Sequence, residues 1–302
     1  MPDQDPERSL PAAHIVGGVS LADLGAMTVE IAEAVASFAI EERPQELIQH
    51  TKSSATDIAT QMDAAAEAMA RHMINERRPG DGIIGEEGTN DAAGNGLIWI
   101  VDPIDGTTNY LYGLPAWAVS VAVMFEGRTV AGCVCAAELD MTVFAVLGSG
   151  AWMRRRGERN RLAVSGQSDL SRSLIGTGFG YSQQRRAGQG QMVAGILPQV
   201  RDIRRVGAAS IDLCWVAAGL LDGYYELGLH SWDFAAGALI IEEAGGVIST
   251  LDGRSVWPGS HSQTDLSREW DTIVAAGPGI HADLMQLIQG CDAEWSPGLD
   301  EV

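Results

Sequence analysis

The segment WIVDPIDGTTNY, residues 99–110, contains the features around which the rest of the chain is best interpreted. The apolar run LIWIV, residues 97–101, predicts a buried strand, because continuous hydrophobic segments of this length are typical of strands covered on both faces. The run stops at Asp102 and Asp105, which lie on either side of Pro103 and one further residue. We therefore expect two carboxylates just past a strand end, in a turn that the proline stiffens.

Further acids occur at comparable places in the chain. Glu86 follows a short predicted strand in GIIGEEG, and Asp233 opens a predicted helix. Taken singly, each acid has an ordinary alternative, since Asp233 could be no more than a helix N-cap. Crowded carboxylates repel one another unless cations neutralise them, and their hard oxygen atoms suit Mg²⁺. Together with Asp102 and Asp105, these acids predict a metal site.

A glycine-threonine turn directly follows the two aspartates. Gly106 allows the backbone to approach a ligand closely, and the residues after it are expected to start a helix. Free N–H groups at a helix start suit a phosphate, and the Thr107 hydroxyl can orient a water molecule. The same turn is also common N-cap chemistry. Its position directly after two candidate metal ligands favours the phosphate interpretation.

The overall charge limits the partners of this protein. The 302 residues carry a formal net charge of -20. Nucleic acids and anionic membranes demand Lys and Arg, so we expect neither as a partner. The four cysteines are interpreted as buried apolar residues in a reducing cytosol, and the polar, acidic start does not resemble a secretion signal. These features predict a cytoplasmic protein.

The pattern of elements changes along the chain. Residues 1–18 are expected to form a disordered leader, and residues 55–77 are expected to be helical. In residues 19–167, helices precede mainly antiparallel strands. In residues 168–302, strands and helices alternate, which is typical of an α/β layer. We therefore predict an α+β half followed by an α/β half, with a soft boundary near residue 168.

Three stretches resemble the signatures of a known family. They are GEEG at 85–88, WIVDPIDGTTNYLYGLP at 99–115 and WDFAAGALIIEEAGG at 232–246. With the upstream segment KSSATDIATQMD at 52–63, they resemble the inositol monophosphatase family. The resemblance implies a layered α-β-α-β-α sandwich of the inositol monophosphatase and fructose-1,6-bisphosphatase type. It also implies a Mg²⁺-dependent phosphomonoesterase that is usually dimeric and often lithium-sensitive.

The resemblance also implies roles for individual residues. Two or three Mg²⁺ ions would be bound by Glu86, Asp102, the Ile104 carbonyl, Asp105 and Asp233. Glu86 and Thr107 would position the attacking water, and Asp57 would lie in an outer shell near a weaker third ion. The substrate would contact Gly106 and Thr107 through its phosphate, and Gly207, Ala209 and Glu226 through its ring.

Several substrates are compatible with these residues. We expect a small phosphorylated polyol, with myo-inositol 1-phosphate favoured because Glu226 would accept hydrogen bonds from ring hydroxyls and repel a second phosphate. The alternatives are histidinol phosphate, 3′-phosphoadenosine-5′-phosphate and fructose 1,6-bisphosphate. A hypothesis of a different class is a non-catalytic binding partner of the RNA-synthesis machinery. Loss of a metal ligand would indicate that role, and here every expected ligand type is present.

Two groups near these motifs are given structural interpretations. His230 precedes Asp233 by three residues, but a metal shell made of oxygen atoms does not require an imidazole. The basic run Arg154 to Arg156 could meet an anion. In so acidic a chain, a solvated turn is the favoured interpretation.

Overall fold

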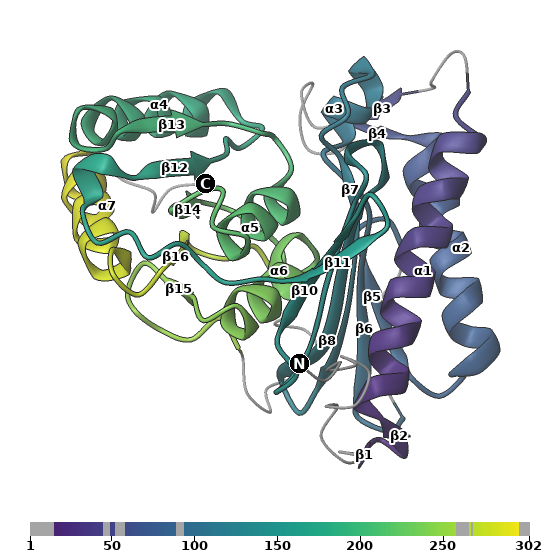
Figure 1. Ribbon diagram of the computed structural model, residues 1–302. Helices are drawn as coiled ribbons and strands as arrows, with labels where there is room; N and C mark the ends of the chain where they lie inside the picture. The colour runs from purple at the N-terminus through teal and green to yellow at the C-terminus, as the bar shows by residue number, and fades with distance from the viewer. Residues whose placement is uncertain are drawn as a thin grey trace.

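The computed structural model describes residues 15–44, 49–51, 58–88, 94–257, 266 and 268–295. Its helices and sheets are stacked in alternating layers, as Figure 1 shows. One outer layer contains α1 (Leu21–Glu41) and α2 (Gln61–Arg77), the middle helical layer contains α5 (Ala209–Ala217) and α6 (Ser231–Glu243), and the other outer layer contains α4 (Gln183–Ile196) and α7 (His281–Trp295). A sheet separates each pair of helical layers, which confirms the predicted α-β-α-β-α sandwich.

The larger sheet is formed by the first half of the chain. Its seven strands lie in the order β11-β10-β9-β8-β7-β6-β5, and all neighbours are antiparallel except β5 and β6. The strands are β5 (Gly82–Gly85), β6 (Leu97–Asp105), β7 (Ala118–Phe125), β8 (Arg128–Ala136), β9 (Met141–Val146), β10 (Ala151–Arg155) and β11 (Glu158–Arg161). The mainly antiparallel arrangement agrees with the sequence pattern.

Strand β6 extends further than its apolar run suggested. It continues to Asp105, so Asp102 and Asp105 lie inside the strand rather than just past its end. The pairing with β7 shifts register between the two aspartates, which marks an irregularity of the β-bulge type. Pro103 has no N–H to donate to the ladder, and prolines within sheets are tolerated at such bulges. The bulge re-aims the end of the strand before the short helix α3 (Thr107–Tyr112).

The smaller sheet belongs to the second half. Its order is β13-β12-β14-β16-β15, with β12 parallel to both its neighbours and the other pairs antiparallel. The strands are β12 (Leu174–Thr177), β13 (Asp202–Arg204), β14 (Gly223–Glu226), β15 (Val247–Thr250) and β16 (Ile273–Ala276). The predicted boundary at residue 168 falls in the segment between β11 and β12.

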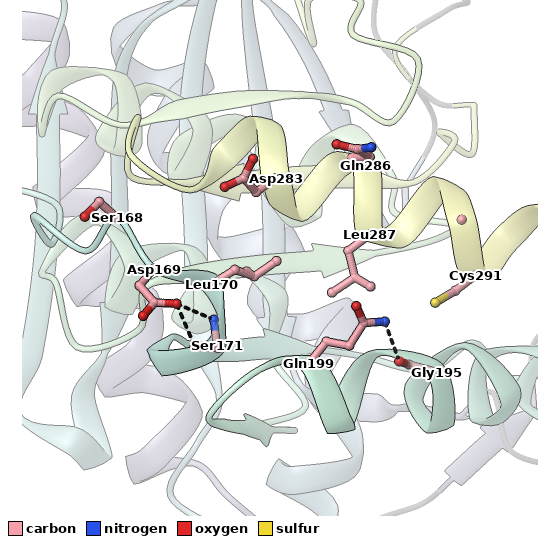
Figure 2. Close-up of a pocket in the computed structure, with 11 residues that line it drawn as sticks. Ser168, Asp169, Leu170, Ser171, Gly195, Gln199, Asp283, Gln286, Leu287 and Cys291 are labelled. Atoms are coloured by element: carbon pink, nitrogen blue, oxygen red, sulfur yellow. Dashed lines mark hydrogen bonds between the residues drawn. The ribbon is translucent and has the colours of Figure 1, made fainter.

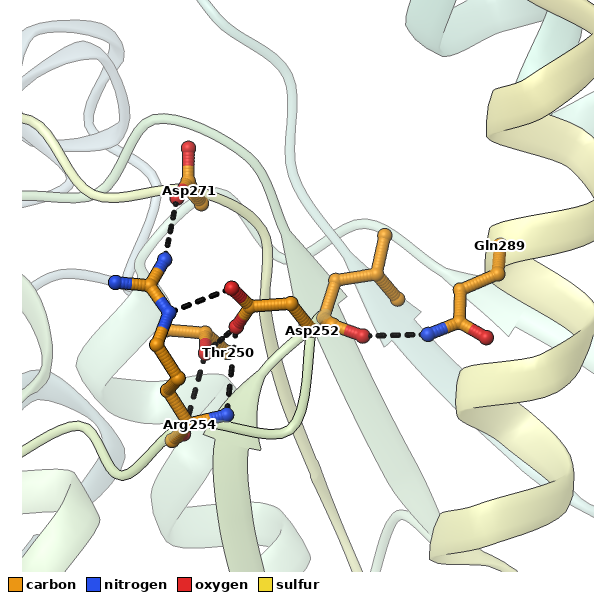
Figure 3. A network of polar contacts seen from close by, with 6 residues as sticks. Thr250, Asp252, Arg254, Asp271 and Gln289 are labelled. Atoms are coloured by element: carbon orange, nitrogen blue, oxygen red, sulfur yellow. Dashed lines mark hydrogen bonds and ion pairs between the residues drawn. The ribbon is translucent and has the colours of Figure 1, made fainter.

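Polar contacts hold the turn that follows β15 (Figure 3). The Asp252 carboxylate accepts hydrogen bonds from the Thr250 hydroxyl and the Arg254 guanidinium, and Arg254 also pairs with Asp271. Gln289 of α7 donates to the Leu251 carbonyl at 2.7 Å. These contacts fasten the last helix to the edge of the smaller sheet.

The hydrophobic core is divided by the layers. Apolar side chains of α1 and α2 pack on one face of the larger sheet, while α5 and α6 fill the space between the two sheets. The packing of α6 on β8 is close, because a Cβ atom added at Gly132 would lie 2.9 Å from the Ala236 Cα. A third cluster joins the smaller sheet to α4 and α7.

Two predicted boundaries near the N-terminus are wrong. The expected helix 55–77 begins only at Gln61, because β4 (Ile58–Thr60) pairs with β3 (Gln49–Thr51). The last residues of the expected leader 1–18 instead lie in a hairpin, because β1 (Ile15–Val16) pairs with β2 (Val19–Ser20) before α1. Residues 1–14 lie outside the described ranges. Among the residues that the structure describes, no helix is both long and apolar enough to cross a membrane.

Candidate active site

A cavity of about 440 Å³ brings together most of the predicted site residues. They come from both halves of the chain and from the ends of five elements, β5, β6, α5, β14 and α6. The predicted residues that line the cavity are Glu86, Asp105, Gly106, Gly207, Ala209, Glu226 and Asp233. Residues far apart in sequence therefore share one concave surface, as expected for a small-molecule site.

A larger cavity, of about 780 Å³, lies between α4 and α7 and is shown in Figure 2. It contains none of the predicted site residues. One of its two acids, Asp169, already accepts a hydrogen bond from the Ser171 N–H at 3.0 Å, and the other, Asp283, lies on α7. We therefore place the candidate site in the smaller cavity, where the carboxylates gather.

Strand pairing explains how the acids of β5 and β6 meet. The parallel register places Gly85 opposite Val101, so Glu86 and Asp102 follow at the same edge of the sheet. Asp102 is almost completely buried and accepts a hydrogen bond from the Ile104 N–H at 3.0 Å. The parallel pair therefore brings Glu86 and Asp102 to one edge of the larger sheet, and their membership of a single metal site stays a prediction.

Asp105 is held by the start of α5. Its carboxylate accepts hydrogen bonds from the Ala209 N–H at 3.3 Å, from the Ser210 N–H at 2.7 Å and from the Ser210 hydroxyl at 2.5 Å. Burial raises the pKa of Asp105, and the bonds from Ser210 and Ala209 oppose this effect. Ser210 is a contact that the sequence interpretation missed, because only the fold brings it to Asp105.

Asp233 enters the site from the first turn of α6. Its carboxylate accepts a hydrogen bond from the His230 N–H at 2.6 Å, so it forms half of a capping box as well as facing the cavity. Burial raises its pKa well above the usual range, and the nearby charges of Asp105 and Glu86 raise it further. The His230 ring stacks on Trp232 with centroids 4.6 Å apart, in agreement with a structural role.

The chemistry of this group fits a hard divalent cation. The predicted acidic residues that line the cavity are buried or half-buried, and Arg205 is the cation whose charge lowers the pKa of Asp105. Such crowding is unfavourable without added positive charge, and oxygen ligands are those that Mg²⁺ prefers. Within the described ranges, no group of three acidic, His or Cys side chains is arranged to hold a metal ion directly. The carboxylates are instead engaged in the local hydrogen bonds described above.

Thr107 has an acidic partner that the sequence interpretation did not identify. Its hydroxyl lies 2.9 Å from the Asp63 carboxylate and 3.1 Å from the Ile104 carbonyl oxygen. Asp63 is fully buried in the first turn of α2. The residue predicted for the outer shell, Asp57, lies outside the described ranges. The segment 52–63, which carries Asp57, ends at Asp63. The position of Asp63 in that segment was the signal from which its contact with Thr107 could have been proposed.

A second residue of α2 supports the loop that contains Glu86. Glu67 lies one helical turn after Asp63 and is 2% exposed. Its carboxylate accepts hydrogen bonds from the Glu87 N–H and from Arg71, both at 2.7 Å. A Cβ atom added at Gly88 would lie 2.3 Å from the Glu67 carboxylate, so this loop and the helix are in direct contact.

The opposite side of the cavity is formed by α5 and β14. Glu226 accepts a hydrogen bond from the Tyr224 hydroxyl, and burial raises the pKa of Glu226 to about 7. Asn109 donates to the Val206 carbonyl at 3.0 Å, which holds the backbone before Gly207 against α3. Gly106 has a φ of 89°, and a Cβ added there would lie 3.2 Å from the Gly207 carbonyl. The two glycines allow this close approach.

Comparison with known proteins gives a consistent result. The model of the inositol monophosphatase family matches residues 21–293. The inositol-1-monophosphatase SuhB of Mycobacterium tuberculosis is 42% identical over 243 residues, which are 79% of this chain and 80% of that protein. The Nus factor SuhB of Pasteurella multocida is 37% identical over 81% of this chain and 87% of its own. An IMPase from Thermotoga maritima has a similar structure, with a TM-score of 0.79 at 27% identity, covering 91% of this chain and all of that one.

The family match and the similar solved structures define the class of this protein as a metal-dependent phosphatase. The chain belongs to the inositol monophosphatase family. Members of this family generally depend on a metal ion, most often Mg²⁺.

Proposed function

We propose that this protein hydrolyses myo-inositol 1-phosphate with the help of Mg²⁺. The single observation that carries the substrate proposal is the position of Glu226, which lines the same cavity as Asp105 and Asp233. A carboxylate in the same cavity as these acids accepts hydrogen bonds from hydroxyl groups and repels an additional phosphate. A neutral polyol with one phosphate satisfies both conditions.

The proposed metal site consists of Glu86, Asp102, the Ile104 carbonyl, Asp105 and Asp233. Divalent cations bound there would supply the positive charge that activates a water molecule and neutralises the phosphoryl oxygens. Two or three Mg²⁺ ions per site would favour the ionised forms of Asp105 and Asp233, whose pKa values are raised by burial and, for Asp233, also by the charges of Asp105 and Glu86. The carboxylates would hold this charge next to the substrate phosphate.

The remaining residues position the reacting groups. Thr107, with its hydroxyl close to Asp63, orients the attacking water together with Glu86. The N–H groups of Gly106 and Thr107 bind the phosphate, because α3 begins there and its first N–H groups have no partner within the helix. Gly207 and Ala209 contact the ring, and Glu226 accepts hydrogen bonds from its hydroxyls. Positioning and electrostatic stabilisation then provide most of the catalysis.

The proposal is tested by measuring phosphate release from a panel of substrates in Mg²⁺ and in EDTA. Inositol 1-phosphate should give a higher kcat/KM than histidinol phosphate, 3′-phosphoadenosine-5′-phosphate and fructose 1,6-bisphosphate. Glu226→Gln should reduce this preference, whereas Glu126→Gln, in an exposed turn, should not. A higher kcat/KM for a bisphosphate in the unaltered protein would contradict the proposed substrate.

A second candidate function is favoured by one relative. The Pasteurella multocida protein is a Nus factor, and this chain is 37% identical to it. A role as a binding partner of the RNA-synthesis machinery is therefore proposed as the alternative. A stoichiometric partner recovered by affinity purification, together with no phosphatase activity in Mg²⁺, would favour it. We further propose a homodimer in the cytoplasm, which sedimentation and cell fractionation would test.

A further inference from the structure

A third concave surface lies on the face of the larger sheet that α1 covers, opposite the face that packs on α5 and α6. It is a groove of about 440 Å³ between α1 and the strands β9 and β10. Its lining is mainly apolar, with Val29 on the helix and Phe144, Val146 and Trp152 on the strands. Its volume and apolar lining are those of a small-molecule site, which typically encloses roughly 300–1,000 Å³.

The rim of this groove contains basic residues of the hairpin β10–β11. In the antiparallel register Trp152 is opposite Arg161, and Arg154 is opposite Arg159. Opposed residues and residues two apart share a face of the sheet. These three arginines therefore lie on the same face as Trp152, while Arg155 lies on the other face.

The two acids of the groove are already neutralised. Glu33 pairs with Arg154, and Glu30 accepts a hydrogen bond from Arg77 at 2.7 Å. Arg159 stacks on the rings of Trp152 and Phe144, with its guanidinium carbon 4.3 and 5.1 Å from their centroids. Within the described part of the chain, no carboxylate forms an ion pair with Arg159. An exposed guanidinium without a counter-charge thus borders an apolar groove in a protein whose net charge is -20.

From this charge complementarity we propose that the groove binds a small anionic amphiphile, with a carboxylate or phosphate head at Arg159 and an apolar tail on Phe144, Val146 and Trp152. The head forms charge-assisted hydrogen bonds with the Arg159 guanidinium, which retains its stacking on the rings. The tail covers apolar surface that α1 leaves exposed. We commit to a free amphiphile rather than a membrane lipid, because the groove is a bounded cavity and the protein as a whole is strongly acidic.

The test uses decanoate as the probe, titrated into the full-length protein and followed by calorimetry. We expect binding at one site, about tenfold weaker in Arg159→Gln because a charge-assisted contact is lost. Arg155→Gln, on the opposite face of the same hairpin, is the matched control and should bind normally. Ala26→Phe fills the groove from an exposed position of α1 and should abolish binding. Binding of 1-decanol should be insensitive to Arg159→Gln.

A cooperative thermal transition shows that each variant is folded, and phosphatase activity should be unchanged, since no catalytic group is altered. Several results would overturn the proposal. They are the absence of decanoate binding to the unaltered protein, equal weakening by Arg155→Gln and Arg159→Gln, and sedimentation with phosphatidylglycerol vesicles without any binding of free decanoate. Decanoate affinity that falls as protein concentration rises would assign the groove to a second copy of the chain and would also overturn it.

Discussion

The hydroxyl of Thr107 lies 2.9 Å from the carboxylate of Asp63, a residue 44 positions earlier in the chain. This contact joins the first turn of α2 to the first turn of α3, across the end of β6. Both residues are buried, so the contact is protected from competing water. It gives the Thr107 hydroxyl a fixed orientation at the edge of the candidate site.

Replacing Thr107 with valine should lower kcat about 100-fold, a typical loss when the positioning of a reacting group is disturbed, because the hydroxyl proposed to orient the attacking water is removed. The buried Asp63 carboxylate also loses a partner, so the free energy of unfolding should fall by about 1–3 kcal/mol. Steady-state kinetics well below the unfolding temperature separate the two effects. Thr108→Val, at the exposed neighbouring position, is the control, and equal losses of activity in both variants would contradict a specific role for Thr107.

Asp102→Asn should weaken Mg²⁺ binding and lower kcat/KM by at least about 100-fold, because a neutral amide replaces a carboxylate ligand. Calorimetric titration with Mg²⁺ and a phosphatase assay over a range of Mg²⁺ concentrations measure both effects. Asp283→Asn, in the cavity between α4 and α7, is the matched control. Normal Mg²⁺ affinity and activity in Asp102→Asn would contradict the proposed role of Asp102 as a metal ligand.

Glu226 should make the metal-free protein less stable as pH rises. Its folded pKa, about 7, exceeds the ordinary value of 4.5, so between these values the folded state binds more protons than the unfolded state. The contribution of Glu226 to the free energy of unfolding is fully present below pH 4.5 and is lost as the pH rises through 7. This contribution amounts to roughly 3 kcal/mol. Glu226→Gln should abolish this loss, so the variant should gain stability relative to the unaltered protein at pH 8 but not at pH 4.5. Urea unfolding in EDTA measures the difference, and an equal difference at both pH values would contradict it.

Asn109 should contribute to both stability and substrate binding, because its side-chain amide joins two segments. It donates to the carbonyls of Ala116 at 2.6 Å and Val206 at 3.0 Å. Asn109→Ala should reduce the free energy of unfolding by about 1–3 kcal/mol and raise KM, since the backbone before Gly207 loses its support. Asn160→Ala, on the exposed strand β11, should leave both unchanged. Urea unfolding measures the stability and steady-state kinetics measure KM. An unchanged KM in Asn109→Ala would show that this contact does not support substrate binding.

Much of the fold followed from local patterns, and the errors have identifiable causes. The helix predicted for residues 55–77 begins at Gln61 because β4 finds a pairing partner in β3, which the helical periodicity alone does not reveal. Strand β6 continues to Asp105 because a bulge accommodates Pro103 within the sheet. In both cases a neighbouring strand overrode the local signal.

The candidate site was predicted unevenly for a similar reason. Residues within the motifs, such as Glu86 and Asp105, could be proposed as metal ligands from the sequence, because they are carboxylates at the ends of predicted strands. Asp63 and Glu67 were missed because their significance depends on what α2 contacts after folding. Arg205 lines the cavity but carries no recognisable signal beyond its place in the run RRVG.

The amino-acid sequence by itself determined which groups are available: carboxylates at strand ends, a glycine-threonine turn after them and an acidic surface. These properties depend on neighbours along the chain, so local patterns are sufficient to predict them. Only the tertiary structure decided which groups meet, such as Ser210 with Asp105 across 105 positions, or Arg159 with an apolar groove. Those distances depend on how the layers pack, because hydrophobic burial between sheets and helices brings together segments that have no local relation.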